Sequence, residues 1–281
     1  MVIRPRDAGC SVSQCGLVVA LLVCLAAMCW HASYYLPFMA DDAFISLRYA
    51  ERFIEHKGLN WTDGPHVEGY TNFLWVIANA FMGFLGFDLI LAARILGTAS
   101  ACVIIFMLFY YTRRAIPSGS QLASFMAAAG FIALSPPVAV WAVGGLENVM
   151  LAAFLVAGMV HILLYLDQPH TGENKRLYYA GILLGFFVLT RADAPLVVAA
   201  ISITLFLLVG GSFKQRFVCA AIIGGVPFIF FLLQLCLRIV YYHDILPNTY
   251  YAKFALTGSR LAGGKEYMYY LSYGLLPVMR G

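Results

Sequence analysis

The sequence predicts an all-α membrane protein in which a bundle of helices crosses the bilayer several times. Of its 281 residues, 62% are hydrophobic and only 11% are charged, whereas soluble domains carry about 25% charged residues. Apolar runs close to the ~20 residues that span a bilayer recur along the chain. Short Lys/Arg clusters separate these runs, which indicates orientation in a membrane and not binding of nucleic acid. We therefore expect one transmembrane domain over residues 1–281.

The first apolar run, at residues 16–36, is expected to be an uncleaved anchor with its N-terminus in the cytoplasm. Arg4 and Arg6 precede it, and its length exceeds the ~7–15 apolar residues of a secretory signal. The sequence offers no convincing small-residue cleavage site before Asp41. The segment that begins at residue 37 should therefore lie outside the cell.

The positions of the basic clusters predict which of the later apolar runs cross the membrane. These runs lie at residues 73–87, 89–112, 121–142, 148–166, 177–190, 195–212 and 217–242. The clusters are Arg113-Arg114, Lys175-Arg176 and Lys214 with Arg216. If all three clusters are cytoplasmic, the runs between them cross in pairs and the run at 73–87 cannot cross. That run is also shorter than a span, so we expect a juxtamembrane or re-entrant helix there and about seven spans in all.

Residues 37–72 are expected to form a catalytic loop outside the membrane. Apolar residues recur at helical spacing after the Asp41-Asp42 pair, with charged residues between them. This pattern is typical of an amphipathic helix that lies in the membrane interface.

Two further features concern the cysteines and the end of the chain. The seven cysteines lie mostly inside apolar runs, without a paired spacing for metal or disulfides, so we expect them to be core residues. A last apolar stretch, residues 267–279, is too short to cross. It predicts that the chain is truncated at its C-terminus.

The adjacent carboxylates Asp41 and Asp42 are the first candidates for a catalytic role. Carboxylates beside a membrane are costly unless they are solvated, paired or in use. One interpretation is a helix N-cap. The other is a general base whose neighbour orients the acceptor or holds a metal. Glu147, behind a Gly-Gly turn, could likewise cap the next helix or share the site.

Arg191 and Asp193 lie between two apolar runs and are candidates for binding a phosphate or sugar. They could form a local ion pair at a helix junction. An arginine at a membrane surface is also suited to a phosphate through paired hydrogen bonds. In the segment 241–253, an aromatic belt explains the tyrosines better than it explains Asn248 and Lys253, which could bind phosphate or sugar hydroxyls.

A third group of candidates lies late in the 37–72 loop. His66, Glu68 and Tyr70 are either ordinary loop residues or the lining of an acceptor groove. The sequence has no Gly-rich phosphate loop and no G-x-S-x-G motif, so a soluble nucleotide donor and a serine nucleophile are unsupported.

Five segments, in this order, resemble the bacterial GT-C membrane glycosyltransferases. The closest group is that of the terminal arabinofuranosyltransferase of the mycobacterial cell wall and its relatives. The segments are Asp41–Ala50, Glu68–Trp75, Gly145–Glu147, Leu189–Asp193 and Leu246–Lys253. The resemblance covers roughly residues 16–255 and implies a GT-C-like bundle in a bacterial cytoplasmic membrane with its active face outside.

The resemblance also implies a reaction and roles for the candidate residues. A sugar would pass from a polyprenyl-phosphate donor to a hydroxyl of a glycan, lipid or protein acceptor, with inversion by direct displacement. Asp41 or Asp42 would be the base, Glu147 the acid of the second external loop, and Arg191 the residue that neutralises the donor phosphate. Whether the reaction uses a divalent metal ion is left open; Asp42 and Glu147 would be its ligands.

Two departures from the family pattern, and two other functions, accompany this interpretation. His243 stands where the family would have a glycine, and the further spans and external C-terminal domain of relatives are missing. The chain could therefore be an inactive fragment or a subunit that binds lipid-linked sugar. A transporter or flippase for a polar solute would need polar residues near the bilayer midplane and inverted repeats, and the sequence shows neither.

Overall fold

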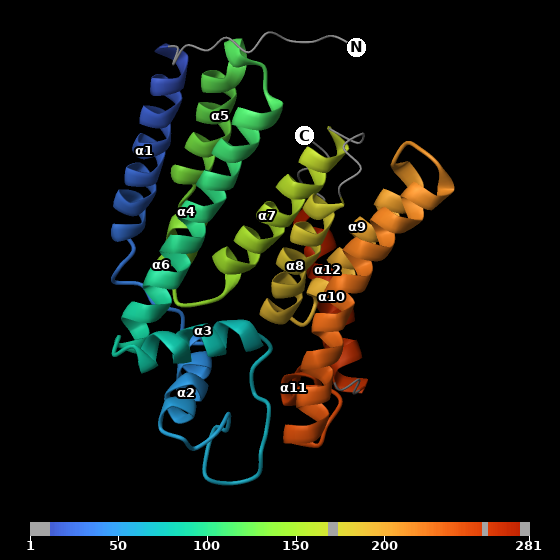
Figure 1. The fold of residues 1–281 in the computed structure, drawn as a ribbon. Helices are drawn as coiled ribbons and strands as arrows, with labels where there is room; N and C mark the ends of the chain where they lie inside the picture. The colour runs from blue at the N-terminus through green and yellow to red at the C-terminus, as the bar shows by residue number, and fades with distance from the viewer. Residues whose placement is uncertain (1–11, 168–173, 255–257, 276–281) are drawn as a thin grey trace.

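The computed structural model describes residues 12–167, 174–254 and 258–275, and every regular element in these ranges is a helix (Figure 1). The predicted all-α class is therefore confirmed. The helices are α1 (Val12–Ser33), α2 (Ala43–Ile54), α3 (Phe73–Phe84), α4 (Leu89–Ala115), the short 3-10 helix η1 (Ser118–Ser120), α5 (Gln121–Ala133), α6 (Pro136–Val143), α7 (Asn148–Leu166), α8 (Lys175–Thr190), α9 (Ala194–Leu208), α10 (Phe213–Tyr242), α11 (Asn248–Phe254) and α12 (Gly258–Leu275).

The long helices run alternately up and down, so that their ends gather at two opposite poles (Figure 1). One pole holds the end of α1, the start of α4, the turns α6–α7 and α8–α9, and the end of α10. We call this pole the cavity end. The three basic clusters lie at the opposite pole, in the last turn of α4 and the first turns of α8 and α10.

The expected number of about seven spans is not confirmed. Four helices are long and apolar enough to cross a membrane (α1, α4, α7 and α10), and a fifth span results if α5 and α6 count as one. Those two helices are bent by 53°, because Pro136 disfavours helical backbone at Ser135 and starts a new helix.

Helices α8 and α9 are each shorter than a full membrane span. With 16 and 15 residues, they rise about 24 and 22 Å, less than the ~30 Å of a bilayer core. The run predicted to reach residue 212 ends at Leu208, because Val209 is extended and Gly210-Gly211 follows.

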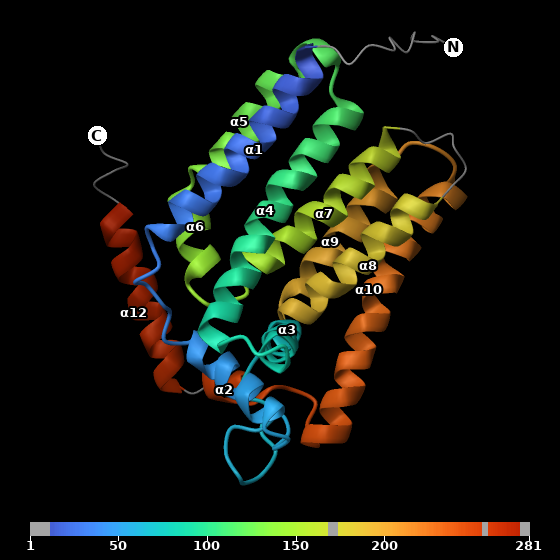
Figure 2. The ribbon, with the colours of Figure 1, turned by 60° about the vertical axis from the view of Figure 1, so that its left-hand side comes forward.

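Helix α3 lies across the cavity end instead of along the bundle (Figures 1 and 2). Its 12 residues are too few to cross, as the charge pattern predicted for this run. Trp75 is fully buried and its indole Nε1 donates to Gly145 O at 3.1 Å. This hydrogen bond fixes α3 against the turn that precedes α7.

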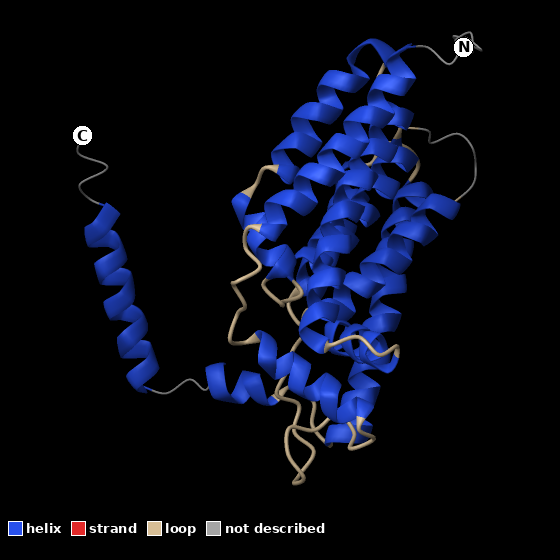
Figure 3. Ribbon diagram, turned by 90° about the vertical axis from the view of Figure 1, so that its left-hand side faces the viewer, coloured by secondary structure: helices blue, strands red, loops and turns tan. Residues whose placement is uncertain are grey.

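The two largest apolar cores of the described residues lie in the two halves of the bundle, and the 37–72 loop contacts both halves. One core joins α1, α4, α5, α6 and the start of α7, and the other joins the end of α7 with α8, α9 and α10. On the first side Ala40 N donates to Gly144 O, and on the second Leu59 N donates to the Tyr241 hydroxyl. Helix α12 stands apart from the bundle (Figure 3).

Candidate functional site

A polar cavity of about 890 Å³ lies at the cavity end of the bundle. Segments far apart in the sequence line it together. They contribute residues from 42–46 and 69–72 of the loop, 146–148 before α7, 188–196 between α8 and α9, 231–238 of α10, and 245–250 beyond α10. The cavity thus brings together Asp42, Glu147, Arg191 and Asp193, which the sequence singled out on separate loops.

The structure separates the two adjacent aspartates. Asp42 is exposed, lines the cavity and occupies the N-cap position of α2, yet its carboxylate caps no helix N–H and has no hydrogen-bond partner among the described residues. Asp41 does not line the cavity, and its Oδ1 accepts from Asp42 N at 2.9 Å. Of the pair, only Asp42 presents an unengaged carboxylate to the cavity.

Glu147 is buried at the end of a chain of polar side chains. It occupies the N-cap position of α7, but its Oε2 accepts from Asn72 Nδ2 at 2.8 Å instead of from the helix. Asn72 also donates to Ser46 Oγ at 2.9 Å. Both Ser46 and Asn72 line the cavity, and neither was predicted, because neutral residues of a loop give little signal in a single sequence.

Arg191 connects the turn between α8 and α9 with Glu147. Its Nε and Nη2 donate to the Asp193 carboxylate at 2.9 and 3.4 Å, as expected for a local ion pair. Its Nη1 lies 3.4 Å from Asn148 Oδ1 and 3.8 Å from Glu147 Oε1. Asp193, Glu147 and Arg191 all line the cavity, so the expected phosphate-binding arginine lies in the same cavity as Asp42.

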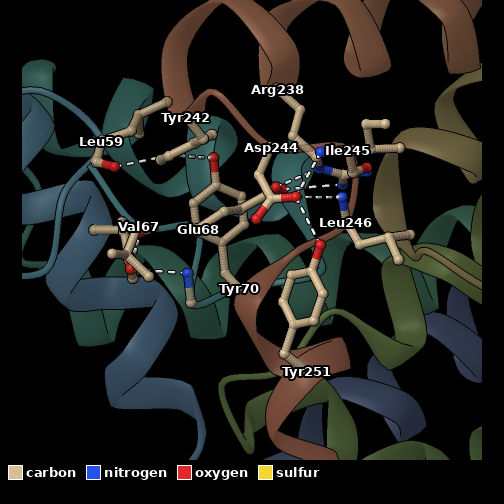
Figure 4. Close-up of polar contacts among 12 residues, drawn as sticks. Leu59, Val67, Glu68, Tyr70, Arg238, Tyr242, Asp244, Ile245, Leu246 and Tyr251 are labelled. Atoms are coloured by element: carbon tan, nitrogen blue, oxygen red, sulfur yellow. Dashed lines mark hydrogen bonds and ion pairs between the residues drawn. The ribbon is translucent and has the colours of Figure 1, made fainter. Parts of the chain in front are cut away.

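Glu68 forms a buried ion pair with Arg238 of α10 (Figure 4). Arg238 Nε and Nη2 both donate to this carboxylate, and Nη1 donates to Ile245 O at 3.2 Å. Burial raises the pKa of the Glu68 carboxyl above its ordinary value, and the guanidinium counteracts part of that rise. Arg238 lines the cavity, whereas Glu68 lies behind it.

Arg238 was missed by the sequence interpretation, although a signal was present. It lies inside the apolar run 217–242 together with Gln234, one turn earlier, which also lines the cavity. A charged residue within a membrane-spanning run is by default a candidate for function.

The remaining predicted residues differ in how they relate to the cavity. Tyr70 lines it and its hydroxyl lies 3.1 Å from that of Tyr242, and burial raises the pKa of Tyr70. His66 is exposed and does not line the cavity; its ring lies tilted against that of Tyr241, at 4.6 Å between ring centroids. Asn248 begins α11 and its N–H donates to Glu68 O at 2.9 Å. Lys253 belongs to α11, and its side chain lies outside the described residues.

The described residues contain no group of three or more His, Cys, Asp or Glu side chains placed to hold a metal ion. The Glu147 carboxylate is already engaged by Asn72 and Arg191. Asp42 and Glu147 therefore stay a predicted pair of ligands, and the described part of the chain places no third carboxylate, thiolate or imidazole with them.

An apolar crevice of about 500 Å³ adjoins the polar cavity between α8, α9 and α10. Val188, Pro195 and Phe231 line both spaces. The crevice continues along α9 and α10 past Ser202 and Gly224 toward the opposite pole. A ligand with a polar head and a hydrocarbon tail would find surfaces of both kinds, one directly after the other.

Comparison of the chain with protein-family models, with curated proteins and with solved structures gave no match.

Proposed function

We propose that this chain is a membrane glycosyltransferase that takes a sugar from a polyprenyl-phosphate donor and transfers it to an acceptor hydroxyl. The observation that carries the proposal is the continuity of the polar cavity with the apolar crevice through Val188, Pro195 and Phe231. An amphiphilic donor matches this shape, with its isoprenoid chain against α9 and α10 and its sugar phosphate beside Arg191. The resemblance of the five sequence segments to GT-C enzymes points to the same donor.

The cavity residues supply the groups that such a transfer needs. The acceptor oxygen would attack the anomeric carbon while the bond from that carbon to the phosphate oxygen breaks, which inverts the configuration. Asp42, as the unengaged carboxylate, would take the acceptor proton. Arg191 would stabilise the charge that develops on the departing phosphate. On this proposal the cavity end lies on the outer face of a bacterial cytoplasmic membrane.

The test is transfer of labelled sugar from short-chain polyprenyl-phosphate sugars to glycan, lipid and protein acceptors by the purified chain. Loss of a general base costs about 10²- to 10⁴-fold in rate, so Asp42→Asn should reduce transfer by at least the lower figure. Asp41→Asn is the matched control and should retain most of the activity, because Asp41 does not line the cavity.

Three results would redirect the proposal. Equal transfer by both variants would show that Asp42 is not the base. Binding of the donor without transfer by the unmodified chain would instead favour a subunit that holds lipid-linked sugar. Movement of a polar solute across vesicles, without transfer, would favour a transporter.

A further inference from the structure

The ion pair between Glu68 and Arg238 joins the 37–72 loop to α10 but leaves part of the hydrogen-bonding capacity of Arg238 unused. Arg238 is 7% exposed and Glu68 5% exposed, and burying two charges is costly even when they are paired. A guanidinium has five N–H groups. Glu68 engages two of them and Ile245 O a third. The part of the chain that the structure describes provides no acceptor for the other two, one on each terminal nitrogen.

These two N–H groups belong to a residue that lines the polar cavity. Arg238 is otherwise almost fully buried, so the cavity is where a ligand could supply acceptors for these two N–H groups. Gln234, one helical turn earlier on the same face of α10, lines the cavity as well. Helix α10 therefore presents polar donors to the cavity from within an apolar span.

We propose that Arg238 is a second anion-binding residue of this cavity, which Glu68 holds in place and which donates its two remaining N–H groups to the anionic group of the ligand. This inference rests on the proposed function and extends it, because the donor phosphate would then contact an arginine from α10 as well as Arg191. Arginine suits this role since it stays charged and offers a planar fork to phosphate oxygens.

Arg191 provides a structural parallel. It too holds a carboxylate, that of Asp193, through Nε and Nη2, and it too directs Nη1 to a second acceptor. Both arginines thus stand in the cavity wall with a carboxylate on one edge. The carboxylates keep each arginine electrically balanced before the ligand binds.

The test measures how strongly the chain discriminates farnesyl phosphate from uncharged farnesol in detergent solution. The quantity compared is the Kd for farnesol divided by the Kd for farnesyl phosphate. The key variant is the double substitution Glu68→Gln with Arg238→Gln, which removes both charges and leaves no unpaired buried charge. We expect its ratio to fall at least about tenfold, since hydrogen bonds to charged groups contribute roughly that much to binding.

Arg52→Gln is the matched control. Arg52 is also a buried arginine that pairs with an acid of the loop, Asp63, but it does not line the cavity. Its substitution should leave the ratio unchanged. If the double variant does not fold, Arg238→Lys provides the comparison, because one ammonium cannot offer a planar fork to both Glu68 and a phosphate.

The outcomes separate this inference from the proposed function. A double variant that keeps the wild-type ratio would overturn the role of Arg238 and leave only a structural pair. If the ratio falls in Arg191→Gln alone, the inference is overturned and the lipid-phosphate donor stands. A wild-type ratio near one would overturn the lipid-phosphate donor itself, and the inference with it.

Discussion

Asp244 orders the turn that follows α10. Residues directly after it, within 245–250, line the cavity. Its Oδ1 accepts from the Tyr251 hydroxyl at 2.8 Å and from the N–H groups of Ile245 and Leu246 at 2.7 and 3.3 Å (Figure 4). The hydrogen bond from Tyr251, helped by the two backbone N–H groups, holds the pKa of Asp244 below its ordinary value. The ionised form is therefore the one that the folded chain favours.

The lowered pKa of Asp244 determines how the free energy of unfolding changes with pH. The contribution of Asp244 to the free energy of unfolding is fully present above its unfolded pKa, about 4, and is lost as the pH falls through the lowered folded value. Thermal unfolding between pH 2.5 and 6, a range chosen around that value, should show less acid destabilisation in Asp244→Asn than in the wild type. Parallel curves for the two proteins would contradict the assignment.

Asn72 holds the buried Glu147 carboxylate in its place on the cavity wall. Because a carboxylate that loses a buried donor forfeits a charge-assisted hydrogen bond, Asn72→Ala should lower the free energy of unfolding by about 1–3 kcal/mol. Asn60→Ala is the control, since Asn60 is equally buried in the same loop but bonds only Lys57 O and the Tyr241 hydroxyl. Its cost should be smaller, about 0.5–1.5 kcal/mol. Equal losses in denaturant titrations would count against a special role for Asn72.

For individual residues, the sequence identified charged candidates in loops more readily than polar candidates within helices. Asp42, Glu147, Arg191, Asp193 and Tyr70, which the sequence singled out, line one cavity, and their roles there stay predictions. Acids and arginines are conspicuous in a chain with so little charge. Arg238 was read as part of an apolar run. Glu68 was assigned to an acceptor groove, yet its carboxylate is committed to Arg238, a partner 170 residues away that no local pattern specifies.

The contact between α4 and α6 depends on a glycine. A Cβ at Gly97 would collide with the backbone carbonyl of Ala142, which cannot move aside as a flexible side chain could. Gly97→Ala should therefore lower the thermal stability, by an overpacking cost on the order of 1–3 kcal/mol. Gly130→Ala in α5 is the matched control, because a Cβ there meets nothing within 4 Å. If both variants melt together with the wild type, the helices are not packed as closely as described.

Helix boundaries show why the expected number of about seven spans is not confirmed. Hydrophobicity marks where a chain is apolar and not where its helix bends or stops. The run 121–142 is continuous in composition but divides at Ser135-Pro136, and α9 stops before Gly210-Gly211. The run at 73–87, which was expected not to cross, forms a helix of only 12 residues, in agreement with the short length that the expectation used.

For the whole molecule, the charges distinguish the two poles. At the cavity end, Arg48, Arg52, Lys57, Arg191 and Arg238 form ion pairs with acids. Arg94, near the start of α4, donates instead to Leu36 O at 2.6 Å. Within the described ranges, no ion pair joins an acid to the basic clusters of the opposite pole. Unpaired Lys and Arg between spans favour the cytoplasmic side, so this asymmetry is the one that the proposed outward-facing cavity requires.

Cysteine labelling in intact cells tests that orientation. Gly64 lies in the loop at the cavity end and Gly119 in η1 at the opposite pole, and a Cβ at either position meets no atom closer than 3.6 Å. A membrane-impermeant maleimide should label Gly64→Cys in intact cells, whereas it should label Gly119→Cys only after permeabilisation. The unsubstituted chain gives the background from its seven native cysteines. The reverse pattern would place the cavity in the cytoplasm, where a donor displayed on the outer leaflet could not reach Asp42 or Arg191, and the proposed reaction would fail on geometry alone.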